Sequence, residues 1–178
     1  VVLYGQFTEV TNRIIGNNFL VFQIIFHPGA LFRLTGIPST ELTNQYMDAG
    51  LVFSSQIKLV NEQLAAANDY KEMVQVADAF VQQLIKQQRK QRMHIDDACL
   101  LLLHSEGKFN LDQLSKAAFL SSKQLERKFK ERTGVNPKLF ERIIRFDKVF
   151  RYKNSHPQFD WLRIAVACDY HDYQHLAK

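Results

Sequence analysis

The stretch FNLDQLSKAAFLSSKQLERKFKERTGVNPKLFERIIRF, residues 109–146, decides the fold of the second half of the chain. Its apolar residues follow a helical period that stops and restarts, once after a serine and once after a proline. Asn110 and Ser121 can each cap a helix, and each is followed three residues later by glutamine, as in a capping box. Gly134 is a stop signal, and Pro137 suits a first helical position. The stretch therefore predicts three short helices in close succession.

The middle helix of the three has one apolar side and one basic side. Leu125 and Phe129 lie four residues apart and predict the buried side. The remaining surface carries charged residues, namely Lys123, Glu126, Arg127 and Lys130. Two short helices joined by a turn of three or four residues, the second of them basic, form a helix-turn-helix. A single helix fits the DNA major groove, and its cations neutralise phosphates, so the pattern predicts DNA binding.

The same pattern recurs at residues 160–178, where Asp160 and Asp172 take the places of helix starts. Between the two copies, residues 137–153 predict one amphipathic helix, roughly 25 Å long at about 1.5 Å per residue. A rigid spacer of this size would hold two recognition helices in successive major grooves on one side of DNA.

Charge is distributed unevenly along the 178 residues. Residues 1–107 hold 8 Lys and Arg against 10 Asp and Glu, whereas residues 108–178 hold 15 against 8, which together give the net charge of +5. A basic segment after a slightly acidic one indicates two modules, the second of which meets a polyanion. The polar bridge at 85–92 predicts a boundary, with domains at 1–90 and 91–178.

The first module has a strand-like beginning and a helical end. Residues 1–35 are rich in β-branched and aromatic residues and predict strands, and residues 36–45 predict a turn entering a short helix. Helical periods follow, one from about Leu51 to Asn68 and one capped by Asp69. The expected fold class is α+β and mainly α: a partial β-sheet, a helical connector and an all-α DNA-binding domain.

The helix after Asp69 has a heptad-like spacing of apolar residues, at Met73, Ala77, Phe80 and Leu84. Two interpretations stay open. The helix packs on its own domain, or residues 69–88 form the seam of a homodimer.

The second half resembles the DNA-binding domain of the AraC/XylS family of bacterial transcription regulators. The resemblance covers about residues 94–178 and is carried by LSKAAFLSSKQLERKFKERTGVNP, the arginine of RIIRF and IAVACDYHDYQHLAK. It implies a cytoplasmic transcription factor with a seven-helix, two-lobed double helix-turn-helix and a linker helix. It also implies recruitment of RNA polymerase, as in an activator, although the sequence does not separate activator from repressor.

The resemblance also implies roles for particular residues. In the first lobe, Lys123, Glu126 and Arg127 would read bases, with Lys130 nearer to phosphate. The second lobe would read bases with four residues, namely Tyr173, Gln174, His175 and Lys178. Arg145 matches the arginine of the family's linker helix, and we expect a structural or backbone role for it.

The chain departs from the family at three positions. The family has glycine in both turns, where this chain has Phe119 and Asp169. Because phenylalanine adopts a left-handed conformation poorly, we expect the first turn to be reshaped. The family also continues past Lys178 with a phenylalanine that buries the second recognition helix, so we expect a C-terminally truncated domain. The N-terminal half resembles the tail of a cupin-like sensor domain, which implies dimerisation or an unknown small-molecule effector.

Other chemistry finds little support in the sequence. Cys99 and Cys168 are far apart and predict buried thiols, while His171 and His175 lack a third metal ligand. We find no cluster of acid, base and nucleophile and no phosphate-binding loop, so we expect no enzyme, no metal and no cofactor. No apolar run is long enough for a membrane span, and no leader pattern is present. The alternative function is a protein-interaction or dimerisation module with degenerate, non-specific DNA binding.

Overall fold

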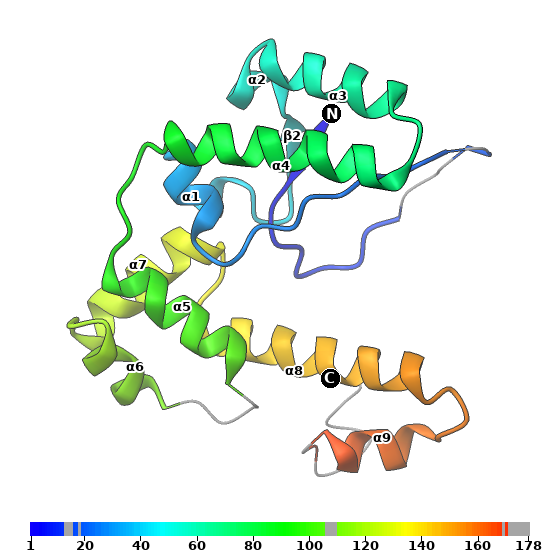
Figure 1. The fold of residues 1–178 in the computed structure, drawn as a ribbon. Helices are drawn as coiled ribbons and strands as arrows, with labels where there is room; N and C mark the ends of the chain where they lie inside the picture. The colour runs from blue at the N-terminus through cyan, green and yellow to red at the C-terminus, as the bar shows by residue number, and fades with distance from the viewer. Residues whose placement is uncertain (13–15, 18, 106–109, 169, 171–178) are drawn as a thin grey trace.

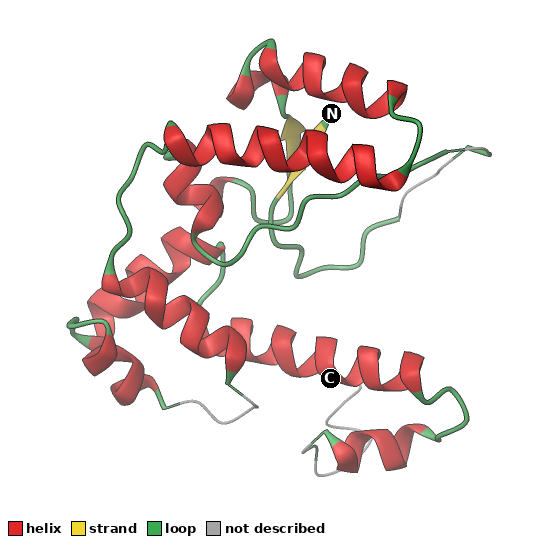
Figure 2. Cartoon of the chain, in the orientation of Figure 1, coloured by secondary structure: helices red, strands yellow, loops and turns green. Residues whose placement is uncertain are grey.

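The computed structural model describes residues 1–12, 16–17, 19–105, 110–168 and 170, and it is mainly helical with a small sheet of two strands (Figures 1 and 2). The elements of the N-terminal half are β1 (Val2–Tyr4), α1 (Ala30–Thr35), the 3-10 helix η1 (Ser39–Glu41), β2 (Tyr46–Asp48), α2 (Gly50–Phe53), α3 (Gln56–Ala66) and α4 (Tyr70–Lys86). The helices of the C-terminal half are α5 (His94–His104), α6 (Leu111–Ala117), α7 (Ser122–Thr133), α8 (Pro137–Ser155) and α9 (Trp161–Ala167).

The N-terminal half has its own apolar core. Helices α3 and α4 lie side by side (Figure 1), and β1 pairs with β2 in antiparallel register, Leu3 opposite Met47. The core between these elements consists of buried apolar residues, namely Leu3, Leu42, Ala49, Ile57, Val60, Phe80 and Leu84. The coarse α+β prediction is therefore confirmed in the sense of a mainly helical chain with a small sheet.

The prediction of strands throughout residues 1–35 is wrong for most of that segment. Among the described residues of this segment, only Val2–Tyr4 forms a strand, and residues 30–35 form helix α1, which is bounded by Gly29 and Gly36 in left-handed conformations. Between 22 and 28 alternate side chains are half-buried, as in a strand, yet the segment has no strand partner among the described residues. β-Branched composition indicates a chain that fits a sheet, and a strand forms only where a neighbour accepts its backbone hydrogen bonds.

The helices after β2 differ from the prediction in one place. The single helix expected up to Asn68 is divided into α2 and α3, because Ser54 between them has a positive φ of 57°. Helix α4 begins as predicted, since the carboxylate of Asp69 accepts a hydrogen bond from the backbone N–H of Glu72 at 2.8 Å.

The heptad-like residues of α4 pack inside the chain. Ala77, Phe80 and Leu84 are buried, and Met73 is half-buried. The Phe80 ring packs edge-on against Phe53, with the centroids 5.5 Å apart. These side chains therefore serve the N-terminal core, and any contact with a second copy through 69–88 would use the outer side of α4.

Helices α5, α6 and α7 and the start of α8 surround a second core. Its fully or nearly fully buried members are Ile95, Ala98, Cys99, Leu102, Leu114, Ala118, Leu125, Phe129, Val135 and Phe140. The predicted caps at Asn110 and Ser121 both form. The side chain of Ser121 accepts from Gln124 N in the expected capping box, whereas that of Asn110 accepts from Asp112 N and not from Gln113. Asn136, just before Pro137, caps α8 by accepting from Leu139 N.

Helix α8 is continuous from Pro137 to Ser155 and extends away from α5–α7 with α9 at its far end (Figure 1). A third small core joins α8 to α9 through Val149, Ile164 and Cys168. Among the aromatic residues of α8, Tyr152 is half-buried against this core, whereas Phe146 and Phe150 are 55% and 54% exposed. At about 100° per residue, Phe146 and Phe150 lie about 60° and about 100° around the helix from the buried Val149.

The connector between α4 and α5, residues 87–93, contains the predicted domain boundary. Its backbone is bonded to the N-terminal half, since the N–H groups of Arg89 and Lys90 donate to the carbonyl oxygen of Arg33 at 2.9 and 3.0 Å. Within the described residues, no helix combines the length and apolar character that crossing a lipid bilayer requires.

Candidate nucleic-acid interface

Helix α7 presents a charged side to solvent and an apolar side to the core. Leu125 and Phe129 are 0% exposed. The predicted base- and phosphate-contacting residues of the first lobe all lie on the exposed side, namely Lys123, Glu126, Arg127 and Lys130. The structure thus brings these four together on one exposed helix surface, three cations beside one carboxylate.

Both ends of α7 are fixed. At its start, Ser121 and Gln124 form a capping box, in which the Ser121 N–H donates to the Gln124 side chain at 3.2 Å. At its end, Gly134 has φ 85°, and its N–H donates to Lys130 O at 2.8 Å. Glycine suits this left-handed position because it has no Cβ. The orientation of the exposed side is therefore set by local sequence at both termini.

The turn between α6 and α7 consists of residues 118–121, and two backbone hydrogen bonds to the end of α6 close it. The Leu120 N–H donates to Ser115 O at 3.0 Å, and the Phe119 N–H donates to Lys116 O at 3.1 Å. This pair of bonds is a Schellman motif, which usually has glycine at the position of Phe119. Phe119 nevertheless has φ 55°, so the expected reshaping of the turn is not observed there.

The ring of Phe119 lies in solvent. It is 77% exposed, and its centroid is 4.8 Å from that of His94 at the start of α5. A large apolar side chain thus projects from the turn beside the start of α5.

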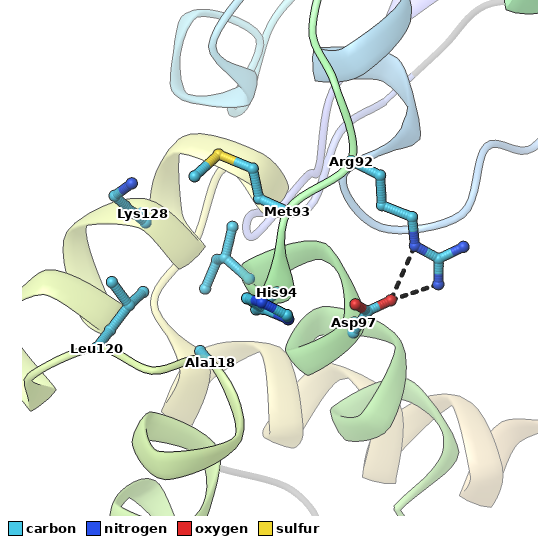
Figure 3. Close-up of a pocket in the computed structure, with 8 residues that line it drawn as sticks. Arg92, Met93, His94, Asp97, Ala118, Leu120 and Lys128 are labelled. Atoms are coloured by element: carbon cyan, nitrogen blue, oxygen red, sulfur yellow. Dashed lines mark hydrogen bonds and ion pairs between the residues drawn. The ribbon is translucent and has the colours of Figure 1, made fainter.

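A surface hollow of about 450 Å³ lies between the start of α5 and this turn (Figure 3). Met93, Ala118 and Leu120 form much of its apolar lining, and Lys128 lies at one side. Arg92, at the opposite side, donates from Nε to Asp97 at 2.8 Å. The hollow is open, and the arginine at its edge is already paired.

Arg145, the arginine matched to the linker helix of the family, lies over an aromatic ring of the second lobe. Its guanidinium carbon is 4.5 Å from the centroid of Tyr170. Burial raises the pKa of the Tyr170 hydroxyl, and the nearby Arg145 charge lowers it in part. Arg145 therefore connects α8 to Tyr170, which lies three residues after the end of α9. A contact of this kind is in line with the structural role that we expected for Arg145.

The second predicted set of DNA-contacting residues, Tyr173, Gln174, His175 and Lys178, lies outside the described residues, as do Asp169 and Asp172. What the structure describes of this lobe is its first helix, α9. Asp160 starts that helix as predicted, since its carboxylate accepts from Arg163 N at 2.7 Å.

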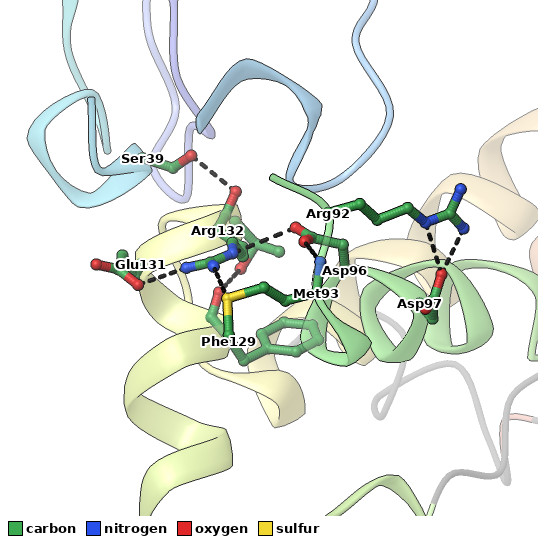
Figure 4. Close-up of polar contacts among 9 residues, drawn as sticks. Ser39, Arg92, Met93, Asp96, Asp97, Phe129, Glu131 and Arg132 are labelled. Carbon is green, nitrogen blue, oxygen red and sulfur yellow. Dashed lines mark hydrogen bonds and ion pairs between the residues drawn. The ribbon is translucent and has the colours of Figure 1, made fainter. Parts of the chain in front are cut away.

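Sequence reasoning missed Arg132, a buried arginine at the end of α7 (Figure 4). Its Nε donates to the carboxylate of Asp96 at 3.2 Å, and both side chains are almost fully buried. Asp96 also accepts from the backbone N–H of Met93 at 2.8 Å, so the same carboxylate stabilises the start of α5. Arg132 and Asp96 lie 36 residues apart in the chain, so the spacing of residues gave no signal for this pair.

The described residues offer little for metal or thiol chemistry. No three His, Cys, Asp or Glu side chains within them are grouped so that they could hold a metal ion. Both cysteines are buried and reduced. Burial raises the pKa of the Cys99 thiol, the neighbouring Asp96 charge raises it further, and Arg132 lowers it in part. A thiol that stays protonated in this way is a poor nucleophile and a poor metal ligand.

Comparison of the chain with protein-family models, with curated proteins and with solved structures gave no match.

Proposed function

We propose that this protein is a sequence-specific DNA-binding transcription regulator of the AraC/XylS type. In this proposal, α6 and α7 are a helix-turn-helix whose second helix, α7, enters the major groove. Lys123, Glu126 and Arg127 face base edges, and Lys130 faces phosphate.

The observation that carries the proposal is the division of α7 into two sides. Its apolar side is fully buried against α5, α6 and α8, so the helix cannot rotate without opening the core. Its outer side holds three exposed cations within eight residues, Lys123, Arg127 and Lys130. A fixed, cationic, exposed helix is what major-groove readout requires, because base edges are reached only by outward side chains and phosphates attract cations.

Helix α8 supports the second part of the proposal, readout of two successive grooves. It is unbroken over 19 residues, which gives a rod of about 28 Å. Its far end carries α9, held by Val149 and Ile164, which are almost fully buried. The successive major grooves of DNA are about 34 Å apart, so a rod of this length suits a two-lobed reader.

The proposal is tested by binding of the chain to a genomic promoter library at two salt concentrations. We expect a small set of selected sites at both concentrations, with affinity falling as salt rises. Arg127→Ala should then lose about 1–3 kcal/mol at particular base positions, because an arginine paired with a guanine edge contributes an amount of this order.

The matched control is Arg89→Ala, which removes the same charge from the exposed connector before α5. It should lower affinity equally for all sequences, if at all. Equal loss of selectivity in the two variants would contradict readout by α7.

A second candidate function is self-association through α4, with only weak, non-selective DNA binding. The observation in its favour is that Tyr70, Val74 and Ile85 are exposed and lie within about 60° of one another around α4. Uniform weak binding across the library, together with dimers in sedimentation of the same preparation, would favour this alternative.

A further inference from the structure

The end of α7 is bonded to a distant part of the chain, residues 29–43, which we call the docking segment. It runs from Gly29 through α1 and η1 to Thr43. The hydroxyl of Ser39 donates to the carbonyl oxygen of Arg132 at 2.7 Å, and that of Thr43 donates to the carbonyl oxygen of Gly134 at 2.9 Å. Carbonyl groups at the end of a helix have no partner within the helix, so these hydroxyls supply what α7 lacks.

The docking segment also covers the buried ion pair of Arg132 and Asp96. The guanidinium carbon of Arg132 lies 4.2 Å from the centroid of the Phe32 ring, a cation–π distance. Figure 4 shows the guanidinium between Asp96, Glu131 and the sulfur of Met93, with Ser39 above the helix end. The side chain of Arg132 is 4% exposed, so this charge depends on the segment for its exclusion from water.

Two glycines allow the close approach. A Cβ on Gly29 would lie 2.7 Å from the carboxylate of Asp96, and a Cβ on Gly134 would lie 2.6 Å from the hydroxyl of Thr43. Both glycines also have positive φ, at 78° and 85°. The absence of a side chain on Gly29 thus lets the start of the docking segment approach Asp96 in α5. Its absence on Gly134 lets the end of the segment approach the end of α7.

We propose that the docking segment acts as a C-terminal cap for α7 and positions it from the N-terminal half. The contacts lie at Arg132 and Gly134, whereas Lys123 and Arg127 lie about one and a half to three turns earlier and stay exposed. Docking therefore orders α7 and leaves its charged side open. It follows that the docked state is the DNA-competent one and that displacement of the segment loosens the recognition helix. The consequence for DNA rests on the proposed function, and the capping itself does not.

The first test uses no DNA. In the full chain, Ser39→Ala with Thr43→Val removes both hydroxyl donors at nearly constant volume. We expect amide hydrogen exchange in the last turn of α7 to accelerate about tenfold, because its carbonyl groups lose their partners and the end frays. Exchange in α9 should be unchanged. The control is Thr40→Ala, an exposed hydroxyl on the same 3-10 helix, which should leave α7 as it is.

Unchanged exchange at the end of α7 in the folded double variant would overturn the proposal. If that variant unfolds, Thr43→Val alone takes its place, since it removes one of the two hydroxyl donors at nearly constant volume. Faster exchange confined to the end of α7 then supports capping, and wild-type exchange overturns it.

The second test measures affinity of the double variant for a library-selected duplex and for a random duplex. Positioning predicts about a tenfold loss on the selected duplex and no change on the random one, because the phosphate-binding cations remain. Faster exchange with unchanged selectivity would overturn the positioning. If the wild-type chain selects no duplex at all, the proposed function is wrong, and the exchange experiment still decides the capping.

Discussion

Phe119 shows how a single residue can occupy a backbone conformation that its side chain disfavours. An L-residue with a Cβ in the left-handed region costs roughly 1–2 kcal/mol, and bulky residues are rarer there than asparagine or aspartate. The turn around Phe119 is held by the buried residues on both sides of it, Ala118 and Leu125 among them. The surrounding core therefore determines the shape of the turn, and the local residue does not.

Replacement of Phe119 measures this cost. We expect Phe119→Gly to be more stable than Phe119→Ala by about 1 kcal/mol, because both variants lose the ring contact with His94 and only alanine keeps the strained Cβ. Denaturant unfolding of the two variants gives the difference directly. A Phe119→Ala variant as stable as Phe119→Gly would show that the turn relaxes to another conformation.

Individual residues also show what the sequence could and could not predict. The caps at Asp69, Ser121 and Asp160 were predictable, because each bonds to a residue three positions away. The position of Arg132 was not, because its partners are Asp96 and the Ser39 hydroxyl, and the latter lies 93 positions away in the chain. Spacing reports neighbours within one helix and carries no information about contacts between distant elements.

At the scale of elements, the helices were easier to predict than the strands. The bounds of α7 and α8 follow from capping residues and from apolar periodicity, both local properties. The strand-like segment 22–28 has the period of a strand, but its pairing depends on a neighbour that local sequence does not specify. For the same reason β2, three residues long, gave no signal of its own.

Helix α8 is the element whose rigidity the proposed two-groove readout needs. Lys148 is exposed near its middle, so a substitution there can break the rod without emptying a core. We expect Lys148→Pro to destabilise the protein by about 3 kcal/mol and to bend α8, because proline removes one backbone hydrogen bond and clashes with the preceding turn. The stretch of DNA protected from cleavage should shrink from two successive major grooves to one.

The control is Lys148→Ala, which removes the same charge and keeps a good helix former. It should protect the full stretch. If Lys148→Pro is folded and protects as much DNA as Lys148→Ala, then α8 does not act as a rigid spacer.

At the scale of the whole molecule, the two halves differ in charge and have separate cores, and they meet at the end of α7. The cores are separate clusters, one around α3 and α4 and the other around α5–α7. The junction between them consists of a cation–π contact from Phe32 to Arg132 and two hydroxyl bonds to the end of α7. It covers the ion pair of Arg132 with Asp96, which lies within the C-terminal half. Because the removal of one partner of a buried ion pair typically costs about 3–5 kcal/mol, a change that exposes this pair should lower the stability of the C-terminal half.

The same buried region gives the whole protein a pH dependence. The Cys99 thiol lies in it at 0% exposure, and burial, with Asp96 close by, raises its pKa in the folded protein. In the unfolded chain the thiol ionises near its ordinary pKa of about 8.5. Above that pH the unfolded state therefore binds fewer protons than the folded state, and stability falls as pH rises.

We expect the free energy of unfolding to fall between about pH 8.5 and 10, with a contribution from Cys99 that approaches about 1.4 kcal/mol per pH unit. The Tyr170 hydroxyl, whose pKa is also raised, adds a fall of the same sign at higher pH. Cys99→Ala should be less stable at neutral pH but should lose the Cys99 part of the slope. Ile95→Val, a buried change on the same helix with no titratable group, should lose stability and keep the full slope. Denaturant unfolding of the three proteins across this pH range makes the comparison, and equal slopes in wild type and Cys99→Ala would mean that the thiol is not held protonated by the fold.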